Sequence, residues 1–252
     1  MLASFQQLFA AENSIDITTQ VKKLNYTEYA DDNSVIVRES GKLPGLGIKI
    51  NHSLPSIKFA INADVFAGLV DYKGQTQTGT PHTTKTDTVI SNVGLSMQLQ
   101  LIPKQHFITA GYSANLWLRD ILPNNGVQAL YETYRWSTIK LGYENHFRTN
   151  SHLFISGIKY LQHANSEMKI DFNGINPTAI PLKNATGWQG YISYIYGINK
   201  KWQFSMQYQH QQWSSNKSET VQVDSQFGQL LINEPRSKTS NDDFKISLIY
   251  QF

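Results

Sequence analysis

The sequence predicts an all-β fold, namely a closed, antiparallel transmembrane β-barrel of about ten strands with short turns at one end and long loops at the other. Three observations lead to this prediction. Long runs of residues alternate between apolar and polar with a period of two, which is typical of strands. Short turns and long polar stretches follow one another in strict alternation along the chain. No apolar run reaches the roughly 18 residues of a transmembrane helix, so a spanning helix is excluded.

The composition agrees with this class and excludes several others. The 252 residues include 22 Lys and Arg against 19 Asp and Glu, a formal net charge of +3. Because no basic cluster accompanies this balance, nucleic acid is not expected as a partner. The aromatic share of 12% argues against disorder. The chain has no Cys, so a disulfide framework, a thiolate nucleophile and a Cys-based metal site are all excluded.

The chain opens on a segment without strand character, residues 1–14. Ala10 and Ala11 resemble the surroundings of a cleavage site, but Gln6 and Gln7 interrupt the apolar stretch and no positive charge precedes it. We therefore expect 1–14 to be an N-terminal periplasmic segment or a leader remnant, followed by one barrel domain over 15–252.

Ten alternating runs follow in chain order. In the third, Phe59, Ile61 and Val65 share one face, whereas Lys58 and Asn62 share the other. The same alternation recurs clearly in four further runs, at 95–101, 108–118, 202–208 and 244–252. The complete set of expected strands is 15–29, 42–52, 57–74, 88–102, 106–121, 128–147, 152–164, 187–198, 202–213 and 244–252.

The connections between these runs differ in length. Short turns are expected at 53–56, 103–105, 148–151 and 199–201. Long loops are expected around 30–40, 75–87, 122–127, 165–187 and 214–243. Strands of about ten residues, tilted by about 45°, are long enough to span a bilayer. Because hydrocarbon offers no hydrogen-bond partners, such strands can cross it only in a closed sheet.

The alternative fold is a soluble β-sandwich or lipocalin-like barrel, which would turn its apolar side chains inward. Here the long strands place aliphatic residues on one face and Gln, Ser, Asn and Gly on the other, so ten of them would leave too small an apolar interior. Aromatic residues also gather near the strand ends, where a membrane barrel carries its two girdles. They are Trp117, Tyr134, Trp136, Phe147, Trp188, Trp202, Trp213, Tyr250 and Phe252.

The closing strand, FKISLIYQF, resembles the C-terminal assembly signal of Gram-negative outer-membrane β-barrels. The residues that carry the resemblance are Phe244, Ile246, Leu248, Tyr250 and the terminal Phe252. It implies recognition by the barrel-assembly machinery and a location in the bacterial outer membrane, in contact with lipid and lipopolysaccharide. The short turns are then periplasmic and the long loops extracellular.

The inward face of the strands predicts a polar lumen. A ten-stranded barrel has little free space once its side chains are placed, so we expect a largely filled lumen. The candidate lining residues are Lys49, Lys58, Asp64, Arg119, Lys140, Glu144, Lys159, Gln203, Gln207 and Lys245. The expected function is a surface binding or structural protein, with an extracellular or protein partner at the loops, or a narrow solute conduit that favours anions.

The alternative function is a hydrolase at the outer rim. Ten strands is also the strand number of the omptin proteases, whose paired acids and Asp-x-His would correspond here to Asp71 and His163. The correspondence is incomplete, because Asp71 has no neighbouring aspartate and Leu161 replaces the aspartate that would orient the histidine. None of the seven His lies in a G-x-S-x-G or His-Ser context of a lipid-modifying enzyme. We therefore expect no enzymatic activity, no catalytic residue, no metal site and no cofactor.

Overall fold

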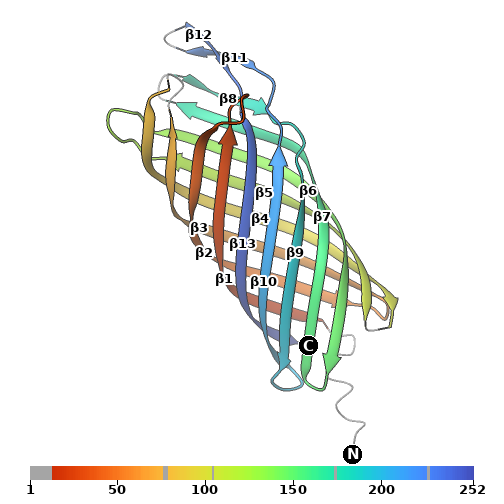
Figure 1. Ribbon diagram of the computed structural model, residues 1–252. Coiled ribbons are helices and arrows are strands. Elements are labelled where there is room, and N and C mark those ends of the chain that lie inside the picture. Colours follow the sequence, from red (N-terminus) through yellow and green to blue (C-terminus); the bar gives the residue numbers. More distant parts are fainter. Residues whose placement is uncertain (1–12, 76–78, 104, 173–174, 226–227) are drawn as a thin grey trace, which may run out of the picture.

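The computed structural model describes residues 13–75, 79–103, 105–172, 175–225 and 228–252. They form one antiparallel sheet that closes on itself, as predicted (Figure 1). Within the described residues no helix is long and apolar enough to cross a membrane. The barrel wall consists of β1 (Ser14–Tyr29), β2 (Val35–Ser53), β3 (Ile57–Gln75), β4 (Pro81–Ile102), β5 (His106–Ile121), β6 (Leu130–Thr149), β7 (His152–Phe172), β9 (Thr186–Gly197), β10 (Trp202–Ser215) and β13 (Arg236–Gln251).

The first and last strands close the barrel. β1 pairs with β13 over its whole length, from Ser14 opposite Gln251 to Tyr29 opposite Arg236. On the other side of the wall β7 pairs directly with β9. No backbone edge of the wall is therefore left open at the level of the membrane, which is the condition for crossing hydrocarbon with strands.

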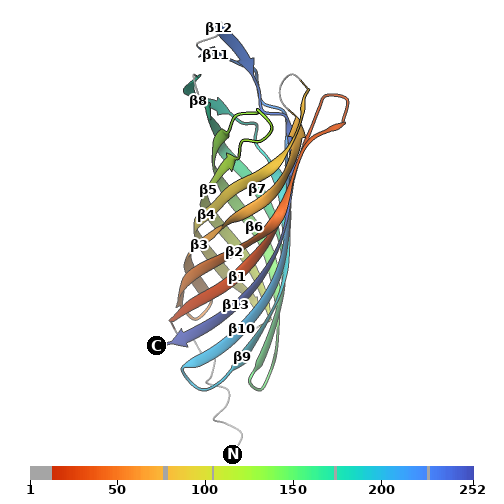
Figure 2. The same cartoon turned by 90° about the vertical axis from the view of Figure 1, so that its left-hand side faces the viewer.

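The predicted long loops are more ordered than expected. β2, β4, β7 and β13 extend into them, and three short strands lie beyond the extracellular end of the barrel (Figures 1 and 2). These are β8 (Ile175–Pro181), which pairs with β7, and the hairpin of β11 (Val221–Ser225) and β12 (Gly228–Ile232). The wall therefore projects above the membrane, because antiparallel pairing satisfies the backbone in water as well as in lipid.

An apolar belt surrounds the barrel below these extensions. Its side chains are exposed although they are large and apolar, which in water would be unfavourable. The belt includes Ile17, Val21, Leu46, Ile48, Ile50, Ile61, Val65, Leu69, Leu95, Leu99, Ile108, Ile139, Leu141, Ile158, Tyr160, Ile192, Met206, Phe244 and Leu248. The soluble alternative is thereby excluded.

Above the belt the alternation reverses its sense. On β1, Val21 faces lipid while Gln20 is buried in the lumen, but further up Lys23 faces outward while Leu24 and Tyr26 are buried inside. The apolar-out, polar-in pattern therefore does not hold over the whole length of the strands. The reason is that the surroundings of the wall change from lipid to water, so an aromatic and aliphatic core fills the upper barrel.

The belt gives a direct test of the register. Replacing Leu95 with Arg places a charge against lipid and is expected to cost about 2–4 kcal/mol of folding free energy. The same substitution at Gln98, an inward residue that donates a hydrogen bond to Glu144, is expected to cost less. Urea titrations of folding into lipid vesicles measure both. Equal costs at the two positions would contradict the assignment of the two faces.

Candidate functional site

A buried charge cluster lies inside the upper barrel. Its centre is Arg119 of β5, whose side chain is 1% exposed. Nη1 lies 2.6 Å from Glu132 Oε2, Nη2 lies 3.0 Å from Glu39 Oε1, and Glu28 Oε1 is 3.8 Å away. Strand register brings only Glu132 beside Arg119, as its direct partner on β6. Glu28 on β1 and Glu39 on β2 reach it across the lumen.

Aromatic rings surround the same guanidinium. Its Cζ atom lies 4.8 Å from the centroid of the Tyr26 ring, 5.2 Å from Trp117 and 5.5 Å from Tyr134. Tyr26 and Trp117 meet edge to face at 5.2 Å, which is a favourable arrangement of aromatic rings. Rings and carboxylates together hold Arg119 in one position.

A fourth carboxylate, Glu234, approaches from the segment between β12 and β13. The Tyr26 hydroxyl lies 3.0 Å from Glu234 Oε1 and the Tyr134 hydroxyl lies 2.9 Å from the same oxygen. Two hydrogen bonds fix the backbone of this segment, from Glu234 N to Ser218 Oγ at 2.8 Å and from Ser218 N to Glu234 O at 2.9 Å. Three carboxylates therefore contact one guanidinium, and the fourth, Glu234, joins the cluster through the two tyrosine hydroxyls.

Because acidic side chains outnumber basic ones in this cluster, its carboxyl groups bind protons more tightly than usual. Glu28 and Glu234 both lie above the belt, since Glu28 is next to the extracellular end of β1 at Tyr29 and Glu234 lies in the segment between β12 and β13. Burial raises the pKa of Glu28 to about 7 although Arg119 opposes the shift, and it raises the pKa of Glu234 well above the usual range, helped by the charges of Glu28 and Glu132. The Tyr134 hydroxyl has one proton but lies within hydrogen-bond distance of both Glu132 and Glu234. The cluster therefore holds protons at neutral pH.

Stability should depend on pH in a defined direction. The pKa of Glu28 is raised from its ordinary value of 4.5 to about 7, so between these values the folded state binds more protons than the unfolded state. The free energy of unfolding is expected to fall as pH rises through this window. Urea unfolding at pH 5 and pH 8 measures it, and Glu28→Gln is expected to flatten the dependence. A rise in stability over this window would contradict the assignment.

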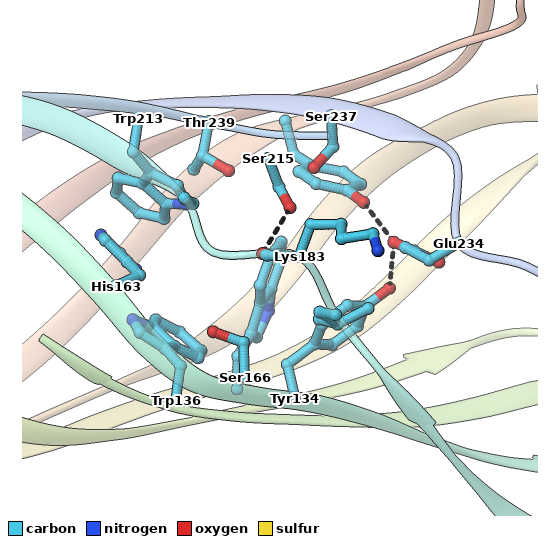
Figure 3. Close-up of a pocket in the computed structure, with 14 residues that line it drawn as sticks. Tyr134, Trp136, His163, Ser166, Lys183, Trp213, Ser215, Glu234, Ser237 and Thr239 are labelled. Atoms are coloured by element: carbon cyan, nitrogen blue, oxygen red, sulfur yellow. Dashed lines mark hydrogen bonds between the residues drawn. The ribbon is translucent and has the colours of Figure 1, made fainter. Parts of the chain in front are cut away.

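A pocket opens beside Glu234 (Figure 3). Its volume is about 50 Å³ when measured for the centre of a water-sized sphere, which is enough for several waters or one compact head group. His163 is stacked between Trp136 at 6.0 Å and Trp213 at 5.3 Å, and these three rings line the side opposite Tyr134 and Glu234.

The rim of the pocket comes from the segment between β8 and β9. Ser215 Oγ donates to the Lys183 carbonyl at 3.3 Å, and His163 N donates to the Ala185 carbonyl at 2.8 Å. The Lys183 ammonium pairs with the exposed Glu219 at 2.5 Å. These contacts hold the rim on the barrel wall, so the pocket exists before any ligand binds.

Two polar atoms of the pocket lining have no hydrogen-bond partner among the described residues, Trp117 Nε1 and His163 Nε2. His163 is 3% exposed and its side chain is buried inside the barrel. An unpaired indole N–H is costly unless an acceptor meets it. Within the described ranges no three His or acidic side chains are grouped so as to hold a metal ion.

The predicted lumen residues all lie on strand positions that alternate with the exposed belt. Arg119 belongs to the cluster above, and the others lie lower. Glu144 accepts hydrogen bonds from Tyr191 and Gln98 and lies 3.5 Å from Lys159 Nζ. The Tyr191 ring packs against Gly157, where a Cβ would come within 2.4 Å of the ring.

The remaining members differ in their contacts. Asp64 accepts from Gln20 at 2.9 Å, Gln207 donates to Gln209 at 3.4 Å, and Gln203 is buried. No hydrogen bond or ion pair joins another described residue to four of the predicted lysines, Lys49, Lys58, Lys140 and Lys245. Their functional role stays a prediction.

The sequence pattern did not predict most of the Arg119 cluster and of the pocket beside Glu234. Trp117 and Tyr134 were expected in the aromatic girdle, but they are 4% and 6% exposed and face the interior. Trp188 and Trp202, by contrast, are 42% and 39% exposed, as girdle residues should be. The available signal was the height of these positions above the belt, where an inward aromatic side chain is favoured.

The two positions matched to the omptin site do not come together. Asp71 lies on the outer surface and forms an ion pair with Lys85. His163 points into the barrel, and the side chain two residues before it, Leu161, is fully buried there. The wall of the barrel separates the two side chains.

Comparison with known proteins shows which solved structures share this fold. No family model and no curated protein sequence matches the chain. Among solved structures it is similar to the outer-membrane protease OmpT of Escherichia coli, with 11% identity over 96% of this chain and 97% of that one and a TM-score of 0.65. It is also similar to the translocator domain of the autotransporter NalP of Neisseria meningitidis, with 8% identity over 98% and 91% and a TM-score of 0.50.

By fold this chain is an outer-membrane β-barrel. Its location is the bacterial outer membrane, among lipid and lipopolysaccharide. The expectation that it is not an enzyme is corrected here, because a barrel of the same fold and nearly the same extent is a protease. The fold is therefore compatible with catalysis as well as with binding.

Proposed function

We propose that the protein binds a small organic cation in the pocket at the extracellular mouth of the barrel. The observation that carries this proposal is the position of Glu234. Its buried carboxyl group lies beside an aromatic pocket, held there by the hydroxyls of Tyr26 and Tyr134. Aromatic faces and a desolvated carboxylate are together the chemistry that recognises an ammonium group.

The charge balance supports a cation rather than a neutral ligand. Glu28, Glu39, Glu132 and Glu234 outnumber the single guanidinium of Arg119, so the cluster is neutralised in part by protons. A cation in the pocket can replace one of them. The unpaired Trp117 Nε1 additionally favours a ligand with an acceptor oxygen close to its charge. A quaternary ammonium compound with a hydroxyl group, such as choline, meets both demands.

The lumen below supports binding at the mouth rather than free passage. A lumen formed by ten strands is narrow, and hydrogen-bonded side chains occupy it. These include Lys22 with Asp243 at 2.7 Å and, lower down, Asn51 with Asp16 at 3.2 Å. We infer a polar, largely filled lumen that makes the barrel a rigid support for the pocket.

Choline titrated against the purified protein, followed by tryptophan fluorescence, tests the proposal. We expect saturable quenching, because three Trp line the pocket. The neutral isostere 3,3-dimethylbutan-1-ol should bind at least about tenfold more weakly, since it cannot interact with the carboxylate. Glu234→Gln should weaken choline binding by a similar factor. The matched control is Glu167→Gln, which changes an exposed acid.

The outcome that would contradict the proposal is equal binding of choline and its neutral isostere. A further expectation concerns pH. Because the cation competes with the proton of a carboxyl group whose pKa is raised, choline affinity should increase as pH rises from 6 to 8. Affinity independent of pH in wild type would show that Glu234 does not contact the cation.

A further inference from the structure

The pocket beside Glu234 has a second polar end, which an ammonium group at Glu234 leaves unused. At this end the buried His163 of β7 is stacked between Trp136 and Trp213, and Figure 3 shows the three rings on the side of the pocket away from Glu234. His163 Nε2 has no hydrogen-bond partner among the described residues. Because a buried nitrogen without a partner is costly, this end of the pocket is suited to a polar group of the ligand.

A hydroxyl group lies at the same end of the pocket. Thr239 of β13 is directly opposite Trp213 of β10 in the strand register, and Figure 3 shows the two side chains next to each other. Thr239 is buried in the wall but lines the pocket. A threonine hydroxyl carries one proton, which it can donate to an acceptor that enters the pocket. The end formed by His163 and Thr239 therefore offers two hydrogen-bonding groups from two strands.

The two ends of the pocket differ in charge. In the pairing of β6 with β7, Thr138 is opposite His163, and Lys140 is opposite Leu161, two residues further down each strand. Lys140 is thus a diagonal neighbour of His163 on the inward face, at about 7–8 Å, which a long side chain can bridge. The acidic side chains of the cluster gather instead at the Glu234 end. An anionic group of a ligand is therefore favoured at His163 and a cationic group at Glu234.

We propose that the pocket selects a zwitterion, a short trimethylammonium carboxylate whose ammonium group lies at Glu234 and whose carboxylate accepts hydrogen bonds from His163 Nε2 and the Thr239 hydroxyl. This inference rests on the proposed function, from which it takes the position of the ammonium group. A carboxylate has an oxygen for each of the two donors, and hydrogen bonds to a charged acceptor are roughly twice as strong as neutral ones. It also selects the imidazole tautomer with its proton on Nε2. The pocket volume of about 50 Å³ limits the chain between the charged groups to a few methylene groups.

Titration of the full chain in detergent, followed by tryptophan fluorescence, tests the inference. The probes are glycine betaine, β-alanine betaine and γ-butyrobetaine, each compared with its primary amide, which is a cation of the same shape without the carboxylate. We expect at least one of the acids to bind at least about tenfold more tightly than its amide, because the acid makes charge-assisted hydrogen bonds. In His163→Phe, which keeps a ring between Trp136 and Trp213, this preference should disappear while the affinity for the amide stays unchanged.

Two further variants complete the test. Thr239→Val removes the hydroxyl and keeps the shape of the side chain, so it should reduce the preference for the acid by at least about threefold. It also replaces His163→Phe where that variant fails to refold. The matched control is His210→Phe, because His210 stacks on the exposed Trp188, with ring centroids 5.0 Å apart, on the outer wall. This control should bind acid and amide as wild type does.

The outcomes separate this inference from the proposed function. Amides and choline that bind as tightly as every acid would overturn the zwitterion and leave the cation pocket intact. Failure of both choline and the amides to bind would overturn the cation pocket and the zwitterion together. Equal losses of acid and amide binding in His163→Phe would also overturn the inference, since they would show that the histidine serves only the stack of rings.

Discussion

Replacing Arg119 with Met is expected to destabilise the folded barrel by about 3–5 kcal/mol at pH 8, because removing one partner of a buried ion pair leaves uncompensated charge behind. Here the substitution leaves Glu28, Glu39 and Glu132 without their common partner in a site where Arg119 is 1% exposed. Urea unfolding in lipid vesicles measures the loss. It should be clearly smaller at pH 5, where protonated carboxyl groups need no counter-ion.

Two controls make this result specific. Arg119→Lys retains the charge but cannot contact Glu39 and Glu132 simultaneously through a planar fork, so we expect an intermediate loss. Arg135→Met removes an exposed Arg whose ion pair with Glu167 is 4.0 Å long, and it should change stability by less than about 1 kcal/mol. If Arg119→Met were as stable as wild type at pH 8, the carboxyl groups of Glu28, Glu39 and Glu132 would not depend on the guanidinium.

Deleting Phe252 is expected to prevent normal accumulation of the barrel in the outer membrane. Phe252 N donates to the Asn13 carbonyl at 3.0 Å, directly after the pairing of β13 with β1 that closes the sheet. Its ring, 59% exposed, lies 6.3 Å from the ring of Tyr250. We propose that these residues, with Phe244, Ile246 and Leu248, are read by the barrel-assembly machinery. An open edge in lipid would cost several kcal/mol for each unpaired group.

Cell fractionation measures this effect. The truncated chain should appear as a degraded periplasmic species, whereas Phe252→Tyr, which preserves a terminal aromatic ring, should reach the outer membrane in normal amounts. Normal yield of the truncated protein would show that the terminal residue is not required for assembly.

The strand positions could be predicted from the sequence because they depend on local patterns. At the periplasmic ends the expected strands 57–74, 106–121 and 202–213 begin at the same residues as β3, β5 and β10. The short turns there leave little freedom. At the extracellular ends the predictions were too short: β13 begins at Arg236, not at residue 244, and β2 at Val35, not at 42. Polar residues that pair above the membrane do not differ in composition from residues of a loop.

The sequence by itself determined the fold class, the number of wall strands and the face of each strand that contacts lipid, because a period of two and the spacing of turns are properties of neighbouring residues. It also placed Arg119 inside the barrel. Only the tertiary structure decided what Arg119 meets. Glu28, Glu39, Glu132 and Glu234 come from three strands and one loop, and they converge because the sheet closes and its inward side chains meet inside the barrel at one height. The reversal of the alternation above Val21 has the same origin, since the solvent around a residue depends on its height in the closed barrel and not on its neighbours in the chain.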